Sequence, residues 1–230
     1  MPKHSILVVE DDRSLSDVLC YNLAQAGYEV AASCDGQDGL NVALRNPPDV
    51  IVLDLMLPVI DGLEVCRRLR ANPTTRDVLV IMLTAKSEES DQVIGLAMGA
   101  DDYVTKPFSV KVMLERVKAL LRRRSVPTDE RNIVRSQGVV IDHISHRATI
   151  DERPLDLTPS EFALLDALVR QPGRAFSRSE LMDKALGDAF VLERTIDVHI
   201  RSLRKKLESG APLIETVRGI GYRFWDPRND

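Results

Sequence analysis

The chain has 230 residues, of which 44 % are hydrophobic and 29 % are charged, and its formal net charge is −4. This composition indicates a globular protein with enough chain for one large or two small cores. Neither half is basic overall, so a nucleic-acid surface would have to be a local cluster of cations. No apolar run approaches the roughly 20 residues of a membrane span and no signal peptide precedes the first strand-like run, so a cytoplasmic protein is expected.

The first half of the chain alternates short apolar runs with segments of helical spacing. Strands are expected at residues 6–9, 29–32, 78–83 and 102–105 and in the run that carries Asp54, and helices at 15–23, 36–45, 63–70, 87–98 and from Ser109 to about 124. This alternation predicts an α/β domain over 1–124, a doubly wound five-stranded parallel sheet. Residues 125–136 lack apolar periodicity and are interpreted as a linker to a second domain at 137–226.

Asp54 is a single carboxylate in an apolar run bounded by Pro48 and Pro58. A buried carboxylate is costly unless it meets a cation or marks the end of its strand, so this position is a candidate site. In a doubly wound sheet the ligand lies beyond the carboxyl ends of the strands. Three cysteines, Cys20, Cys34 and Cys66, are widely spaced and are interpreted as small apolar fillers rather than as disulfide or metal ligands.

The predicted strand ends carry complementary polar residues, namely Glu10, Asp11, Asp54, Thr84 and Lys106. Three converging carboxylates repel one another and need a divalent cation, and hard oxygen ligands favour Mg²⁺ over zinc. A lysine and a hydroxyl suit the oxygens of a phosphoryl group. Each residue alone also has an ordinary interpretation, as a first-turn acid or a surface lysine, but the joint arrangement favours a site.

Four segments resemble the CheY-like receiver domain, whose strand order is 2-1-3-4-5. They are residues 6–12, 50–58 with Asp61-Gly62, 82–85 and 99–108. The resemblance implies that Asp54 is the nucleophile that accepts a phosphoryl group from a histidine kinase. A phosphatase of the haloacid dehalogenase type is disfavoured, because it needs an acid where this chain has Met56.

The receiver resemblance also assigns roles to the other residues of the site. It implies that Mg²⁺ is bound by Asp54, Asp11, the Met56 carbonyl and, through water, Glu10. Thr84 and Lys106 would hold the phosphoryl oxygens, with Lys106 preceding a cis Pro107. Tyr103 would be an aromatic switch that turns inward when Thr84 moves toward the phosphate.

The second half begins with three short antiparallel strands, expected at 138–141, 147–150 and 154–157, and continues with helices. Thr158-Pro159-Ser160-Glu161 and Ser177-Arg178-Ser179-Glu180 are capping boxes, which predict two helix starts. A third helix is expected at 193–209. A hairpin follows, at 213–217 and 222–224, with Arg218 in its turn.

The third helix combines an apolar stripe with a basic outer face. The stripe consists of Ile196, Ile200, Leu203 and Leu207, and the cations are Arg194, Arg201, Arg204, Lys205 and Lys206, against the single acid Asp197. Such a helix fits the major groove of DNA, where arginine reads guanine edges and lysine contacts phosphate. A solvated surface helix is the competing interpretation of the charge pattern alone.

Residues 158–162, 194–200, 203–207 and 216–224 resemble the winged-helix effector domain of the OmpR/PhoB family. The resemblance implies base contacts from Thr195, Val198, Arg201, Ser202 and Arg204, and phosphate contacts from Arg194, His199 and Tyr222. Arg218 would enter the minor groove, and residues 187–192 would touch RNA polymerase. Leu186 departs from the tryptophan common in relatives, which puts one phosphate contact in question.

Together the two resemblances imply a two-component response regulator, phosphorylated by a sensor histidine kinase and binding tandem direct repeats in double-stranded DNA. It would be a phosphoacceptor rather than an enzyme with a separate substrate. Phosphorylation would produce a homodimer through Asp101, Asp102, Arg116, Lys118 and Arg123, although Gln92, Ala97 and Val112 replace charges usual in the family. The alternatives are a phosphorylation-independent DNA binder, a magnesium-dependent phosphatase and a protein-binding winged helix.

Overall fold

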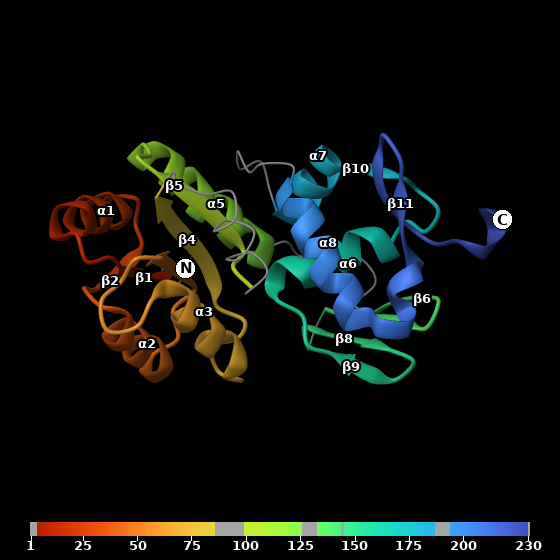
Figure 1. Cartoon of the computed structure of the whole chain (residues 1–230), viewed down its shortest axis with the longest axis horizontal. Coiled ribbons are helices and arrows are strands. Elements are labelled where there is room, and N and C mark those ends of the chain that lie inside the picture. The colour runs from red at the N-terminus through yellow and green to blue at the C-terminus, as the bar shows by residue number, and fades with distance from the viewer. Residues whose placement is uncertain (1–3, 86–98, 126–132, 144, 187–193, 230) are drawn as a thin grey trace. The chain divides into compact units, whose positions relative to one another are not determined.

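The computed structural model describes the chain except for residues 1–3, 86–98, 126–132, 144, 187–193 and 230 (Figure 1). The chain divides into two compact units, Met1–Leu121 and Arg122–Asp230. Within the described ranges, no helix is long and apolar enough to cross a membrane.

The first unit is a five-stranded parallel sheet in the order β2-β1-β3-β4-β5, which confirms the predicted doubly wound fold. Its strands are β1 Ser5–Val9, β2 Glu29–Ser33, β3 Val50–Asp54, β4 Leu79–Ala85 and β5 Asp102–Lys106. Its helices are α1 Arg13–Gln25, α2 Gly36–Arg45, α3 Gly62–Ala71 and α5 Val110–Ser125. Figure 1 shows α1 and α5 on one face of the sheet and α2 and α3 on the other. The helix expected at 87–98 lies outside the described residues.

Three aspartates begin the helices that follow the first three strands. The side chains of Asp12, Asp35 and Asp61 each accept a hydrogen bond from a backbone N–H in the first turn of α1, α2 and α3. These bonds satisfy donors that a helix start otherwise leaves unpaired. The caps therefore determine where the chain turns from each strand end into the next helix.

Gly62 places the start of α3 directly against the end of β3. A Cβ atom at this position would lie 2.1 Å from the backbone oxygen of Asp54, so only glycine permits this approach. The Gly62 N–H also donates a hydrogen bond to the Leu55 carbonyl, at 2.9 Å, which holds the two segments together. Residue 62 thus fixes the backbone that carries the candidate nucleophile.

The cysteines occupy three different environments. Cys66 is buried on α3, and burial raises the pKa of its thiol to about 11. Cys20 is half-buried and Cys34 is exposed. The interpretation as apolar fillers is therefore right for Cys66 and wrong for Cys34.

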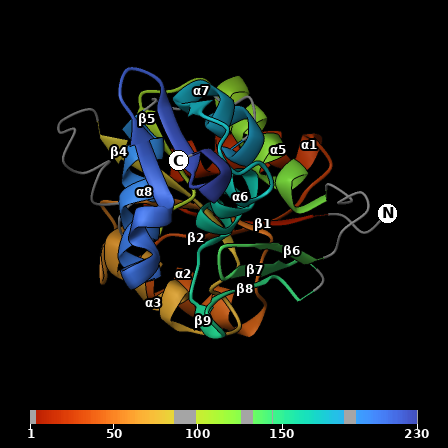
Figure 2. The same cartoon turned by 90° about the vertical axis from the view of Figure 1, so that its right-hand side faces the viewer.

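The second unit contains two antiparallel sheets and a helical core (Figure 2). The four-stranded sheet consists of β6 Ile133–Ser136, β7 Val139–Asp142, β8 Arg147–Ile150 and β9 Arg153–Leu155. Figure 2 shows β6, β7 and β8 side by side, next to the helix α6 Pro159–Val169. Because β6 occupies 133–136, the expected linker is wrong over those residues. Its four residues alternate between exposed and half-buried positions and give little apolar signal.

The remaining elements form a winged helix, as predicted. They are β10 Phe176–Ser177, α7 Arg178–Leu181, the π-helical turn η1 Met182–Leu186, α8 Arg194–Leu207, the 3₁₀ turn η2 Glu208–Leu213, β11 Ile214–Val217, β12 Gly221–Phe224 and the 3₁₀ turn η3 Pro227–Asn229. Both predicted capping boxes are present, at Thr158 with Glu161 and at Ser177 with Glu180. Strand β10 has only two residues, too few for a sequence pattern, and pairs with β12.

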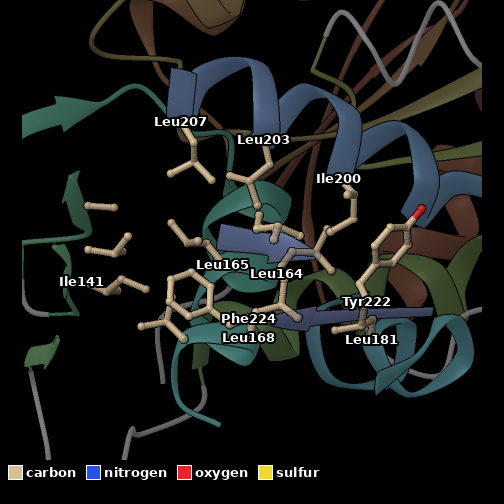
Figure 3. Packing of buried hydrophobic residues seen from close by; sticks show 14 of the residues in the cluster. Ile141, Leu164, Leu165, Leu168, Leu181, Ile200, Leu203, Leu207, Tyr222 and Phe224 are labelled. Atoms are coloured by element: carbon tan, nitrogen blue, oxygen red, sulfur yellow. The ribbon is translucent and has the colours of Figure 1, made fainter. Parts of the chain in front are cut away.

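The apolar stripe of α8 faces the core of the second unit (Figure 3). Its four members, Ile196, Ile200, Leu203 and Leu207, are all at most 1 % exposed. They pack in one cluster with Leu164, Leu165 and Leu168 of α6 and with Phe224 of β12. Burial of this stripe leaves the opposite side of α8 for its charged residues.

Candidate functional site

The carboxyl ends of β1 and β3 bring three carboxylates together. One oxygen from each of Glu10, Asp11 and Asp54 lies within 4.8 Å of the others. Glu10 and Asp54 are buried, at 1 % and 4 % exposure, whereas Asp11 is exposed. The pairing of Val9 with Leu53 places these strand ends side by side, so the cluster follows from the sheet register. The predicted convergence of these acids is therefore present.

Lys106, at the end of β5, supplies the cation that this cluster needs. Its Nζ lies 2.7 Å from Asp54 Oδ2 and 2.9 Å and 2.8 Å from the two oxygens of Glu10. Burial raises the pKa of Glu10, and the bond to Lys106 only partly offsets this effect. Burial alone would lower the pKa of Lys106, but its bonds to Asp54 and Glu10 raise it overall. Lys106 is therefore charged at neutral pH, and the following peptide, to Pro107, is cis as expected.

The donor set fits a small hard cation. Three carboxylates face one ammonium group, so the cluster keeps a net negative charge that a divalent ion would balance. All the side-chain donors are oxygens, which favour magnesium over softer metals. The Met56 backbone N–H donates a hydrogen bond to Asp54 Oδ1 at 3.2 Å, so the backbone of residue 56 lies next to the cluster. The Met56 side chain is 75 % exposed.

Thr84 and Tyr103 belong to the neighbouring strands β4 and β5. Thr84 is 2 % exposed, and its hydroxyl has no hydrogen-bond partner within the part of the chain that the structure describes. Tyr103 is 8 % exposed, so its ring is already turned inward. An open pocket of about 420 Å³ lies beside the cluster, lined by Asp12, Leu15, Lys106, Pro107 and Phe108.

Most residues expected at a dimer face form ion pairs within the first unit. Asp101 pairs with Arg70 at 2.8 Å, and Arg116 Nη1 contacts both oxygens of Asp102 at 2.8 Å. All three expected residues in these pairs are at most 8 % exposed. The exposed Lys118 pairs with Glu115 on its own helix. The side chain of Arg123, and residues Gln92 and Ala97, lie outside the described part.

The exposed face of α8 and the hairpin tip carry the cations that remain available to a ligand. Arg201 and Lys205 are exposed on α8, and Arg218 is exposed in the turn between β11 and β12. Val198 is half-buried on the same helix. The side chains of Arg194, Thr195 and Leu186, and the loop 187–192, lie outside the described residues.

Arg204 and Tyr222 join α8 to the hairpin instead of projecting freely. Arg204 donates two hydrogen bonds to the Ile214 carbonyl, at 3.1 Å and 2.7 Å, and one to Thr216 Oγ1 at 2.8 Å. The Tyr222 hydroxyl donates to Asp197 Oδ1 at 2.7 Å. The base contact expected of Arg204 and the phosphate contact expected of Tyr222 would therefore need side chains that already hold the wing.

His199 and Ser202 also lie differently from what the winged-helix resemblance implied. His199 is 1 % exposed and faces the interior, so it offers no surface to a phosphate in this conformation. Ser202 donates to Glu161 Oε1 at 2.6 Å and is turned toward α6. An α-helix turns 100° per residue, so His199 falls at the edge of the buried stripe, whereas Ser202 lies on the outer half of α8 and is held there by its bond to Glu161.

Sequence reasoning missed two contributors to this face, Arg178 and Glu161. Arg178 Nε lies 2.7 Å from Asp197 Oδ1, and its guanidinium lies 5.3 Å from the centre of the Tyr222 ring. Glu161 accepts hydrogen bonds from two residues of α8. In the sequence both residues belong to capping boxes, and no local pattern connects either of them to a helix more than 15 residues away.

Comparisons with known proteins match both units. The family described as "Response regulator receiver domain" matches residues 6–118, and "Transcriptional regulatory protein, C terminal" matches 152–224. The "Phosphate regulon transcriptional regulatory protein PhoB" of Pseudomonas aeruginosa is 44 % identical over 96 % of each chain, and that of Rhizobium meliloti is 47 % identical over 96 % of this chain and 98 % of its own. The structure "Response Regulator DrrB, a Thermotoga maritima OmpR/PhoB Homolog" covers 98 % of this chain and is itself fully covered, at 31 % identity and a TM-score of 0.52.

Thr84→Val is expected to raise the free energy of unfolding of the first unit by about 1 kcal/mol, because it removes a buried hydroxyl that lacks a partner among the described residues. Thr75→Val is the matched control. Thr75 is equally buried, but its hydroxyl donates to the Leu69 carbonyl at 2.9 Å, so the same change should lower the free energy by about 1 kcal/mol. Urea denaturation of both variants, followed by circular dichroism, would contradict this account if the two shifts had the same sign.

Proposed function

Because this chain belongs to the OmpR/PhoB family of two-component response regulators, we propose that its Asp54 accepts a phosphoryl group from a sensor histidine kinase. The family acts as transcription regulators, with a receiver domain and a DNA-binding domain in one chain. The observation that carries the proposal for Asp54 is the convergence of Glu10, Asp11 and Lys106 on its carboxylate.

Phosphoryl transfer to Asp54 forms a bond from its carboxylate oxygen to phosphorus and breaks the bond from phosphorus to the kinase histidine. Mg²⁺, held by Glu10, Asp11, Asp54 and the Met56 carbonyl, would offset the negative charge that otherwise repels the incoming phosphoryl group. Lys106, already 2.7 Å from Asp54, would donate hydrogen bonds to the phosphoryl oxygens. No group in this proposal hydrolyses a separate substrate, so the receiver assists only its own modification.

We propose that Thr84 senses the phosphoryl group. Its buried hydroxyl can donate a hydrogen bond to a phosphoryl oxygen, and in the described residues it has no competing partner. Tyr103, on the strand paired with β4, would be the residue whose surroundings change when Thr84 moves. Its inward position supports a role in the packing of β4 against β5.

For DNA recognition we propose that α8 enters the major groove and the hairpin tip enters the minor groove. Arg201 and Lys205 on α8 and Arg218 at the tip are exposed cations that fit this role, and the half-buried Val198 precedes Arg201 by three residues on α8. Arg194 and Thr195 keep their expected contacts as part of the proposal. Arg204 and Tyr222 are proposed to support the wing, and His199 and Ser202 are withdrawn from the contact surface.

We propose that phosphorylated chains form a homodimer on tandem DNA repeats. This would take place in the cytoplasm, where the kinase and DNA are both accessible. RNA polymerase would bind at residues 187–192. The exposed Val112, with Lys118 and Arg123 on α5, would line the dimer face. Asp101, Asp102 and Arg116 would first have to leave their internal pairs, which argues for a smaller role than the resemblance implied.

Asp54→Ala is expected to abolish the increase in DNA affinity that acetyl phosphate with Mg²⁺ produces in the wild type, because the acceptor oxygen is gone. Removal of Mg²⁺ by EDTA should abolish the same increase in the wild type. Asp77→Ala changes an exposed aspartate in the turn before β4, at the amino-terminal end of that strand, and is the control that should respond normally. Fluorescence anisotropy with a duplex that the wild-type chain, treated with acetyl phosphate and Mg²⁺, enriches from a randomised pool measures the effect, and an undiminished response of Asp54→Ala would refute the assignment.

Arg201→Ala is expected to weaken binding to a preferred duplex by about 1–3 kcal/mol, because it removes a cation that reaches base edges. Arg147→Ala removes an equally exposed arginine from β8 and should change the affinity little. Electrophoretic mobility shifts at low salt provide the measurement. Equal affinity of both variants and the wild type would favour a protein-binding winged helix instead.

Beryllofluoride, a phosphoryl mimic, is expected to convert the monomer into a dimer, and Val112→Glu should prevent this by placing a charge in an apolar contact. Val18→Glu changes an exposed valine on α1 and is the control, which should still dimerise. Light scattering coupled to size exclusion gives the mass. A monomer mass for the treated wild type would exclude the proposed dimer.

A further inference from the structure

The carboxylate of Glu161 connects the first turn of α6 to two consecutive turns of α8. Its Oε2 accepts a hydrogen bond from the Thr158 N–H at 2.8 Å and lies 2.6 Å from Lys206 Nζ, and its Oε1 accepts from Ser202 Oγ at 2.6 Å. Glu161 is 2 % exposed, so its carboxylate is shielded from bulk water, whereas the Lys206 side chain is 32 % exposed and its ion pair is only partly buried. Ser202 and Lys206 are four residues apart on the same side of α8, so one carboxylate holds the helix at two points.

The second capping box shows that helix capping does not require such contacts. Glu180 accepts from the Ser177 N–H at 2.8 Å, which is the same capping bond that Glu161 makes. Its carboxylate also pairs with Arg174, on the loop before the helix, and both side chains of that pair are more than 40 % exposed. Among the described residues Glu180 has no bond to α8. The two glutamates therefore share one role, and only Glu161 has a second.

We propose that Glu161 is a positioning residue for DNA recognition, whose carboxylate sets the rotation of α8 about its own axis. This inference rests on the proposed function of α8 as the recognition helix. Ser202 and Lys206, which Glu161 holds, face α6. Arg201 and Lys205 each come one residue earlier, and because successive residues of a helix differ by 100°, these two side chains are directed away from α6 and toward DNA. Lys206, held by Glu161, then makes no phosphate contact, whereas the neighbouring exposed Lys205 does.

Glu161→Gln tests the positioning role, because glutamine still completes a capping box but cannot form the ion pair. The probe is a duplex that the wild-type full chain, treated with beryllofluoride, enriches from a randomised pool, and an unrelated duplex of equal length measures non-specific binding. Glu161→Gln should bind the enriched duplex roughly tenfold more weakly, with no loss on the unrelated duplex. Glu180→Gln should leave both affinities unchanged.

Two lysine variants separate positioning from simple charge. Lys206→Met should reproduce the loss on the enriched duplex without changing the salt dependence of binding. The double variant with Glu161→Gln should lose no more than either single variant, since both remove the same contact. Lys205→Met should weaken binding to both duplexes and lower the slope of log affinity against log salt by about 1, as expected for one phosphate contact.

The outcomes distinguish this inference from the proposed function on which it rests. Wild-type affinity of Glu161→Gln for the enriched duplex, or additive losses in the double variant, would overturn the positioning role while leaving DNA binding intact. If the wild type enriches no duplex, both fail. Fluorescence of Trp225, the only tryptophan of the chain, reports whether each variant folds. If Glu161→Gln does not fold, the affinity of Lys206→Met for the enriched duplex tests the positioning role instead.

Discussion

The contact of the Lys106 ammonium with the buried carboxylates of Glu10 and Asp54 is the interaction on which the first unit depends. Two carboxylates within a few ångström of each other in a partly desolvated site repel, and burial raises the pKa of Glu10, so a cation beside them stabilises the pair. The sheet order makes the contact possible, because β1 and β3 are neighbours and the long lysine side chain reaches them from β5, across β4. The same ammonium that stabilises the resting site is thereby already placed for the oxygens of a phosphoryl group.

The second unit uses carboxylates in a related way. Glu161 holds Ser202 and Lys206, and Asp197 accepts hydrogen bonds from both Arg178 and Tyr222. Among the cations of α8 whose side chains the structure describes, these internal bonds distinguish two groups. Arg204 and Lys206 stabilise the arrangement of α6, α8 and the wing, and Arg201 and Lys205 stay exposed for a ligand. A count of positive charges along the helix therefore overstates the number that can contact phosphate.

The sequence was sufficient for the fold and for the convergence of Glu10, Asp11, Asp54 and Lys106 at the strand ends, because both depend on short-range signals. Apolar runs, aspartate caps and strand-end residues occur at fixed spacings, and parallel strands bring their ends to one edge of the sheet. It was insufficient where a side chain has a choice of distant partners. By periodicity Ser202 lies on the outer half of α8 and Arg204 at the edge of the buried stripe, yet each bonds to another element, and Asp102 pairs with Arg116 within its own unit. Such partners depend on packing, which no local pattern encodes.

The central claim is that the buried carboxylate of Asp54 is the group that carries the phosphoryl modification. Borohydride reduces an aspartyl phosphate to homoserine, so treatment of the acetyl phosphate-labelled chain followed by tandem mass spectrometry locates the modified residue. The account predicts homoserine at position 54, in an amount that depends on Mg²⁺, and unmodified aspartate at positions 11 and 12. Homoserine at another acid, or none in a chain whose DNA affinity still rises with acetyl phosphate, would contradict it.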